Sequence, residues 1–316
     1  MILFTAKNEP GEEYIRKINK KIYNIFAQNL KDDTVFLDTT WLEYDDRLID
    51  FVNSNKSKKF LLFSGMDWEN TFCRKEPNKF LQENVDYEYI GNSHNEFYFS
   101  FWLEFAKEFF PVIKPNFIAE KYFMCLNRTP KSHRNYIVEG LYERDLQSKG
   151  IISLGSPTTY HQASKKLKTP ITLNNELNIP NDISTFGPLE LWEKYFFNVV
   201  NETTVHSNTF ISEKTLKPIL GYKPFMILGD QNLYKILHSW GIDTFDDIFG
   251  IGYEKSEWQD RANWIIEITE QLCSESLHQL QKLYYKLEQR LKNNVSFLRQ
   301  QQEKNYQKMV EISKKF

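Results

Sequence analysis

Short apolar runs alternate with stretches of helical hydrophobic spacing along the first third of the chain. The spacing predicts helices over residues 14–30 and 97–110. The apolar runs predict strands at residues 2–4, 34–38, 59–65 with the closing turn, and 85–90. Strands that alternate with helices in this way predict a parallel sheet that is covered on both faces.

A second series of the same kind begins near residue 122. Its predicted strands cover residues 122–127, 151–155, 196–204 and 225–228. Its predicted helices cover residues 132–149, 189–195, 213–220 and 233–240. Pro111 and Pro115 separate the two series and place the candidate linker at residues 111–119. The strand, basic loop, helix and strand of residues 122–155 form a βαβ unit, and such folds bind ligands beyond the carboxyl ends of their strands.

The last forty residues carry apolar side chains at helical spacing with a polar opposite face, which predicts a long amphipathic helix. Such a helix either packs back on the body of the protein or forms the seam of an oligomer. The predicted fold is therefore α/β, with two Rossmann-like domains that face each other across a cleft. The predicted boundaries are 1–115 for an acceptor-side domain, 119–275 for a nucleotide-binding domain and 276–316 for the C-terminal helix.

Composition narrows the class of protein. The chain has 316 residues, 41% of them hydrophobic and 16% aromatic, which is typical of a globular protein with a large core. The net charge of −2 argues against general binding to nucleic acid or to an anionic membrane. Three widely spaced cysteines, no signal-peptide pattern and no apolar run of about 20 residues predict a soluble cytoplasmic protein without disulfides.

The stretch of residues 209–229 predicts a short helix, a tight turn and a buried strand. Ser212 is suited to the N-cap, which places Glu213 and Lys214 in the first helical turn. The helix dipole disfavours a lysine at that end unless an anion lies close by, and a phosphate would supply that anion. The alternative is an ordinary solvated pair on a helix surface.

Most motifs of other enzyme classes are absent from the sequence. There is no phosphate-binding Gly-x-x-x-x-Gly-Lys-Ser/Thr, no His-Glu-x-x-His, no Gly-x-Ser-x-Gly and no Asp-x-Asp. The acidic doublets at residues 45–46 and 246–247 are predicted to be solvated or capping rather than metal ligands. We therefore expect neither a metal nor a cofactor.

Cations follow the predicted strands of the second series. Arg128 and Arg134 flank the start of one predicted helix, and Lys214 begins another. An arginine fork with a lysine charge is suited to clamping a diphosphate, although arginines at a surface also serve solubility. Lys131 and His133, in the same basic loop, are predicted to be incidental.

Residues 212–229, Ser-Glu-Lys-Thr-Leu-Lys-Pro-Ile-Leu-Gly-Tyr-Lys-Pro-Phe-Met-Ile-Leu-Gly, resemble a segment of the α1,3-fucosyltransferase family. The resemblance extends over about residues 120–255 and is weak outside the Glu-Lys pair. It implies a GT-B fold whose C-terminal half binds a nucleoside-diphosphate sugar. It also implies that Glu213 bonds the donor ribose and Lys214 the phosphate. Arg128 matches the arginine after the first strand of the nucleotide domain, a role that Arg134 could take instead.

An inverting sugar transfer also needs a general base to deprotonate the acceptor hydroxyl. Asp67 and Glu69, which follow the predicted strand at 59–65, are the leading candidates. Asp38 is the runner-up and Glu96 the third candidate. The alternative for each of these acids is a capping or solvated side chain.

The sequence thus favours a glycosyltransferase that moves sugar from a nucleoside-diphosphate sugar to an acceptor hydroxyl, inverting and independent of metal. It leaves the acceptor open among a glycan, a protein, a lipid and a nucleic acid. The alternative is a non-catalytic nucleotide- or phosphate-binding module whose C-terminal helix serves assembly.

Overall fold

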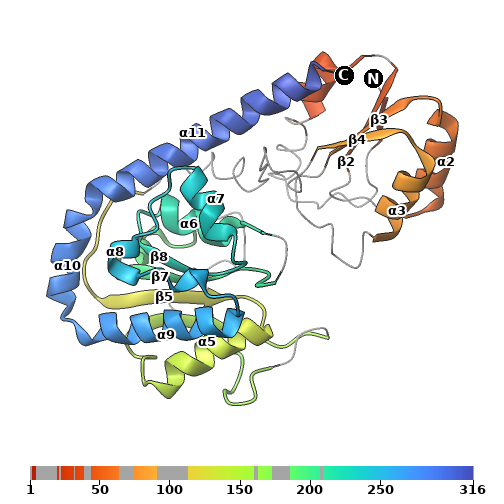
Figure 1. Ribbon diagram of the computed structural model, residues 1–316. Coiled ribbons are helices and arrows are strands. Elements are labelled where there is room, and N and C mark those ends of the chain that lie inside the picture. Colours follow the sequence, from red (N-terminus) through yellow and green to blue (C-terminus); the bar gives the residue numbers. More distant parts are fainter. Residues whose placement is uncertain are drawn as a thin grey trace. The chain divides into compact units, whose positions relative to one another are not determined.

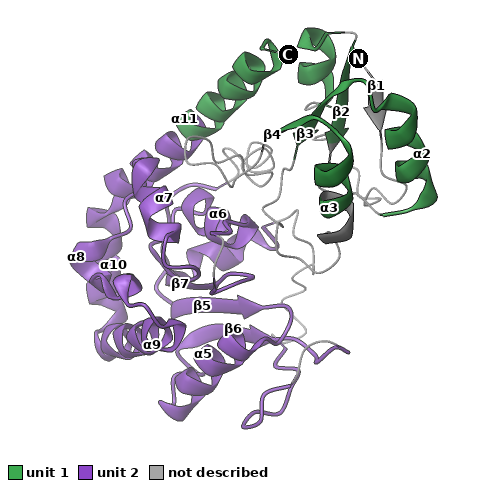
Figure 2. Cartoon of the chain, turned by 45° about the vertical axis from the view of Figure 1, so that its right-hand side comes forward, with its two compact units in different colours: residues 1–105, 300–316 green, residues 106–299 purple. Residues whose placement is uncertain are grey.

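The computed structural model describes residues 2–4, 20, 23–31, 33–38, 44–63, 75–90, 113–159, 163–172, 186–206 and 209–315. The chain divides into two compact units, residues 1–105 with 300–316 and residues 106–299 (Figure 2). Within the described residues, each unit holds a four-stranded parallel sheet. The predicted α/β class with two Rossmann-like sheets is therefore confirmed, as is the long C-terminal helix.

Unit 1, residues 1–105 with 300–316, has the strand order β1-β2-β3-β4. The strands are β1 (Ile2–Phe4), β2 (Thr34–Asp38), β3 (Lys59–Phe63) and β4 (Tyr87–Ile90). Between them lie two described helices, α2 (Asp46–Asn55) and α3 (Lys75–Asn84), which the hydrophobic pattern did not predict. Asp45 caps α2 by accepting a hydrogen bond from the backbone N–H of Leu48.

Both faces of this sheet are buried. On one face the alternate strand residues pack against helices, and this cluster comprises Val35, Leu37, Leu48, Val52, Phe60, Leu62 and Leu81. On the other face Phe36 stacks on Phe26, with ring centroids 4.5 Å apart, and Phe63 contacts both rings. Burial on both faces explains why residues 35–37 of β2 and 60–63 of β3 are apolar without alternation, whereas Glu88 of the edge strand β4 is exposed.

Unit 2, residues 106–299, has the strand order β6-β5-β7-β8. Its strands are β5 (Lys121–Asn127), β6 (Gly150–Leu154), β7 (Tyr195–Asn201) and β8 (Phe225–Leu228). Its α-helices are α5 (Ser132–Glu143), α6 (Glu213–Leu220), α7 (Leu233–Ser239), α8 (Asp246–Phe249), α9 (Trp258–Ser274) and α10 (Leu277–Lys286). Its 3-10 helices are η4 (Leu189–Glu193) and η5 (Gly252–Glu254).

Helices α5 and α9 lie side by side on the sheet (Figure 1). They meet closely at Gly140, where a Cβ would lie 2.4 Å from Cδ1 of Ile266. A larger residue at 140 would force Ile266 into another rotamer or push α9 away from α5, because the terminal methyl of Ile266 occupies the space of the added Cβ. The glycine therefore sets how close α9 lies to the helix that begins at the site described below.

The bounds of two predicted helices differ in the structure. The helix predicted over 132–149 ends at Glu143, and Asp145 adopts a positive φ of 55° in the turn that leads to β6. The predicted single C-terminal helix is two helices: α10, which starts in a capping box at Ser276 and Gln279, and α11 (Glu288–Ser313). Residues 288–299 of α11 group with unit 2, and its remainder groups with unit 1. The helix predicted at 97–110 lies outside the described residues.

No helix within the described ranges combines the length and the apolar character that a membrane-spanning segment needs.

The strand order of unit 2 contains a topological switch point. The next strand in the sequence after β5, β6, pairs with β5 on one side. The strand after that, β7, pairs with β5 on the other side. Connections that leave in opposite directions open a crevice beyond the carboxyl ends of the two central strands, where ligands of open α/β sheets bind. In unit 2 those ends are Asn127 of β5 and Asn201 of β7.

Candidate functional site

Helix α5 begins close to the carboxyl end of β5 with an unusual N-terminus. Lys131 occupies the N-cap position, no side chain accepts a capping hydrogen bond, and the first turn contains no acid. Instead, Lys131, His133 and Arg134 crowd this end of a 12-residue helix. Because the helix dipole disfavours cations there, the sequence stabilises this terminus neither by capping nor by charge.

Arg134 is the most constrained of these cations. Its side chain is 4% exposed, and its guanidinium donates to the backbone carbonyls of Thr129 (3.0 Å) and Glu202 (3.3 Å). Its Nε has no hydrogen-bond partner. No carboxylate in the described part of the chain lies within ion-pair distance. Burial lowers the pKa of Arg134, and the more distant charges of Glu202 and Glu213 oppose that shift.

Lys131 and His133 lie beside it. The Nζ of Lys131 donates to the carbonyl of Thr203 at 2.9 Å, and burial, together with the charges of Arg134 and Lys214, lowers its pKa to about 8. Burial lowers the pKa of His133 to about 4, so the ring is neutral at pH 7. Its Nε2 lies 2.9 Å from the carbonyl of Glu202, which assigns the proton to that nitrogen. Neither residue is incidental to this cluster, contrary to the sequence-based prediction.

The N-terminus of α6, unlike that of α5, has a capping side chain and an acid in its first turn. Ser212 is the N-cap, as predicted, and accepts a hydrogen bond from the N–H of Lys214. The carboxylate of Glu202, which is fully buried, accepts from the N–H of Ser212 (3.0 Å), its hydroxyl (2.6 Å) and the hydroxyl of Thr215 (2.7 Å). An anion of the protein itself thus occupies this helix terminus.

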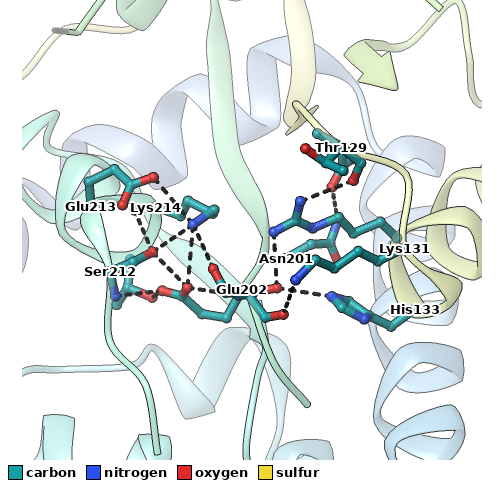
Figure 3. Close-up of polar contacts among 12 residues, drawn as sticks. Thr129, Lys131, His133, Asn201, Glu202, Ser212, Glu213 and Lys214 are labelled. Atoms are coloured by element: carbon teal, nitrogen blue, oxygen red, sulfur yellow. Dashed lines mark hydrogen bonds and ion pairs between the residues drawn. The ribbon is translucent and has the colours of Figure 1, made fainter. Parts of the chain in front are cut away.

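Lys214 is paired within the protein. Its Nζ lies 3.2 Å from Glu213 and 3.7 Å from Glu202, and it donates to the hydroxyls of Ser212 and Thr203 (Figure 3). A lysine in this turn therefore does not require a ligand phosphate, because two carboxylates already supply the counter-charge. The side chain keeps 26% of its surface exposed, so it can still reach a ligand.

The remaining predicted residues fall into two groups. Arg128 is exposed directly after β5, and no other described residue forms a hydrogen bond or an ion pair with its side chain. The candidate bases Asp67, Glu69 and Glu96 lie outside the described residues, as does the side chain of Asp38.

Two buried amide side chains, Asn127 and Asn201, bond to each other at the carboxyl ends of the two central strands. Asn127 donates from Nδ2 to the carbonyl of Ser153 at 3.3 Å, which orients its Oδ1 toward Asn201. Asn201 donates to that oxygen at 3.0 Å, leaving its own Oδ1 without a partner. Asn201 and Glu202 form a polar pair at the end of a buried strand, the one sequence signal that could have located the centre of the site.

The acidic doublet on α8 has structural contacts. Asp246 accepts hydrogen bonds from the hydroxyls of Thr244 and Tyr253, and Asp247 forms an ion pair with Arg290 of α11 at 2.7 Å. Within the described residues, no three His, Cys, Asp or Glu side chains gather closely enough to hold a metal ion.

Comparison with known proteins yields a distant likeness of fold. No protein-family model matches the chain, and no curated protein sequence matches it. Among solved structures, the chain is similar to a crystal structure of an α1,3-fucosyltransferase, at 12% sequence identity and a TM-score of 0.39. The alignment covers 96% of this chain and 90% of that one.

Proposed function

We propose that unit 2 binds the diphosphate of a nucleoside-diphosphate sugar beside the N-terminus of α5, and that the protein is a glycosyltransferase. The observation that carries the proposal is Arg134, a buried arginine whose guanidinium has only carbonyl partners, next to an uncapped helix terminus at the switch point of the sheet. Burying a cation without a contacting anion is costly, and a ligand phosphate would relieve that cost.

The charge of the cluster supports a polyanionic ligand. Lys131, Arg134 and Lys214 bring three positive charges when Lys131 is protonated, and Glu202 and Glu213 bring two negative ones. Both carboxylates lie at the α6 side of the cluster, against Lys214 (Figure 3). The α5 side is left with a net positive charge and with free backbone N–H groups, a combination that favours phosphate.

In the proposed reaction the bond from the anomeric carbon to the diphosphate oxygen breaks and a bond from that carbon to the acceptor oxygen forms. The electron pair of the broken bond goes to the diphosphate, and a general base takes the acceptor proton. Arg134, Lys131 and Lys214 would then stabilise a charge that is larger in the transition state than in the ground state. We assign the base to Asp67 or Glu69, and the contact with the donor ribose to Glu213.

The sequence resemblance of residues 212–229 to the α1,3-fucosyltransferase family supports the same class of donor. The transfer in this proposal is inverting and metal-independent: the sequence lacks an Asp-x-Asp motif, and the cations do the work of a metal. We therefore expect activity to survive EDTA, and loss of activity with recovery on adding Mn²⁺ or Mg²⁺ would contradict that part of the proposal.

Turnover of nucleotide sugars tests the proposal. A panel of nucleoside-diphosphate sugars is screened for thermal stabilisation and for hydrolysis by the wild type and by Lys131→Met. Lys149→Met is the matched control, because Lys149 also donates its Nζ to a single carbonyl, that of Cys273, but lies just before β6, at the amino end of the sheet.

We expect at least one donor to raise the melting temperature of the wild type and of Lys149→Met, and to do so less for Lys131→Met. If no donor stabilises the wild type at millimolar concentration, the proposal is wrong. Stabilisation by nucleotides without hydrolysis or transfer would favour the non-catalytic binding module instead.

A further inference from the structure

Arg261 of α9 is a second buried arginine at the same edge of the sheet. Its side chain is 2% exposed, and Nη1 donates to the carbonyls of Lys255 (2.7 Å) and Ser256 (2.6 Å). Nη2 donates to the carbonyls of Val205 (3.0 Å) and Gly229 (3.1 Å). Within the described residues, no carboxylate lies within ion-pair distance of it, although Asp230 and Glu257 act on it from farther away.

The four carbonyls belong to three separate segments: the loop after β7, the turn after β8 and the entry to α9. Four carbonyl dipoles that point at one place repel each other unless a cation lies between them. A planar guanidinium with several donors in fixed directions can satisfy them together, whereas an ammonium on a single stem cannot reach all three segments. Arg261 therefore fixes these segments relative to one another.

The loop after β7 is the segment that carries the proposed site. The carbonyl of Thr203 accepts a hydrogen bond from the ammonium of Lys131. The hydroxyl of Thr203 accepts one from the ammonium of Lys214. Val205, which Arg261 holds, follows two residues later, so a displacement of Val205 moves Thr203 as well. Both lysines depend on a backbone whose position Arg261 sets.

We propose that Arg261 is a positioning residue that, by fixing the loop from Thr203 to Val205, holds the ammonium groups of Lys131 and Lys214 next to Arg134. The inference rests on the proposed function for the identity of the ligand, but its main test needs no ligand. That test reports where the ammonium group of Lys131 lies in the free protein.

Because of the groups around it, the pKa of Lys131 depends on where its ammonium group lies. The charged and titratable groups around it are Arg134 and His133 on its own helix, Lys214 on α6, and Glu202 and His206 beside Thr203 in the segment after β7. Burial and the two cations lower the pKa of Lys131 to about 8. If the loop loosens, the ammonium moves into water and away from the cations, and its pKa rises toward the ordinary lysine value of about 10.4.

The experiment follows the titration of Lys131 by NMR in lysine-labelled protein without ligand, with the signal assigned from Lys131→Arg. The variants are Arg261→Met, and Arg261→Lys, which keeps the charge but cannot bridge three segments. In both we expect the Lys131 midpoint to rise by at least about one pH unit. Pyrophosphate affinity at pH 7 should fall about ten- to hundredfold, because the cations are misplaced rather than removed.

Lys223→Met is the matched control. Lys223 is 1% exposed and donates to two carbonyls, those of Asn116 and Tyr195, at the amino end of β7. Its loss removes a buried nitrogen donor that bridges two carbonyls at the amino end of the sheet, away from the proposed site. The melting temperature should change, whereas the Lys131 midpoint and the pyrophosphate affinity should stay as in the wild type.

Two results would overturn the inference: an unchanged Lys131 midpoint in both Arg261 variants, or an equal rise in Lys223→Met, which would indicate general loosening. Failure of the proposed function gives a different pattern. In that case the wild type binds neither pyrophosphate nor a nucleoside diphosphate, while the Arg261 variants still shift the titration of Lys131, and the positioning role stands.

Discussion

Two helices that begin at the carboxyl edge of the unit 2 sheet, α5 and α6, have opposite N-termini. α6 has a serine cap, an acid in its first turn and the buried carboxylate of Glu202 against it. α5 has no capping side chain and no first-turn acid, and it carries Lys131 and Arg134 at the same end. The terminus of α6 is satisfied within the protein, so a ligand anion gains more at α5.

Glu202 links the two termini. Its carboxylate serves α6, whereas its backbone carbonyl accepts from His133 and Arg134 of α5. One residue thus contacts both helix starts, but its carboxylate bonds only to residues of the α6 terminus. The contrast between the two termini predicts that changes near α6 mainly affect folding and changes near α5 mainly affect ligand binding.

The largest expected effect is that of Glu202→Ala on stability. The change leaves the N–H of Ser212 and the hydroxyl of Thr215 buried without their acceptor, and it leaves Lys214 without one of its two carboxylates. We expect the free energy of unfolding to fall by about 3–5 kcal/mol, as when one partner of a buried ion pair is removed. Urea unfolding measures it, and a loss below about 1 kcal/mol would contradict the assignment of Glu202 as the internal anion of α6.

Arg134→Met should separate binding from folding. The side chain donates only to carbonyls, so its removal leaves no second charge unpaired, and the carbonyl of Glu202 keeps its contact with His133. Stability should therefore change little, whereas pyrophosphate or nucleoside-diphosphate affinity should fall about 10- to 150-fold, which corresponds to a lost charge-assisted contact of about 1.5–3 kcal/mol.

Calorimetric titration of Arg134→Met beside Arg144→Met makes this comparison. Arg144 lies just past the other end of α5 and pairs with Glu270 on the surface. If Arg144→Met weakens binding as much as Arg134→Met does, the effect is not specific to the terminus of α5.

The pH dependence of binding should report Lys131. Its pKa in the free protein is lowered to about 8, and a bound anion raises it, so binding takes up a proton at higher pH. Affinity should be highest below pH 8 and fall above it, by at most about tenfold per pH unit. Lys131→Met should bind weakly at every pH and lose this dependence, and a wild-type affinity that is constant from pH 7 to 9.5 would contradict the assignment.

The stability of the free protein should show the opposite trend. Because the folded pKa of Lys131 is below its ordinary value, the unfolded chain binds more protons between about pH 8 and 10.5. The contribution of Lys131 to stability therefore rises with pH across that window, and its full penalty is present below pH 8. The difference in unfolding free energy between the wild type and Lys131→Met across the window isolates this contribution.

The smallest expected effect comes from giving α5 the cap that α6 has. Lys131→Ser places a hydroxyl at the N-cap and removes a partly buried cation. We expect a gain of about 0.5–1 kcal/mol in unfolding free energy, together with weaker binding of pyrophosphate. Ser212→Ala is the reciprocal change, and a stability loss there without a gain in Lys131→Ser would mean that the α5 terminus is already satisfied.

The sequence by itself determined the local elements whose signals are short in range. The apolar runs predicted the strands, their alternation with helices predicted parallel sheets, and Ser212 predicted the start of α6. The helices α2, α3 and α9 were not predicted, because tertiary contacts decide them: Leu48 of α2 packs on the sheet of unit 1, and Ile266 of α9 packs on Gly140.

Only the tertiary structure decided which charges meet. Glu202 lies 69 residues from His133 and 10 from Ser212, and its burial cannot be inferred from either neighbourhood. The predicted partner of Lys214 was a ligand phosphate, yet two carboxylates of the chain pair with it, while Arg134 is left without one. Electrostatic energy depends on distances and burial that spacing along a sequence does not contain, so the sequence located the cations but not the one that lacks a partner.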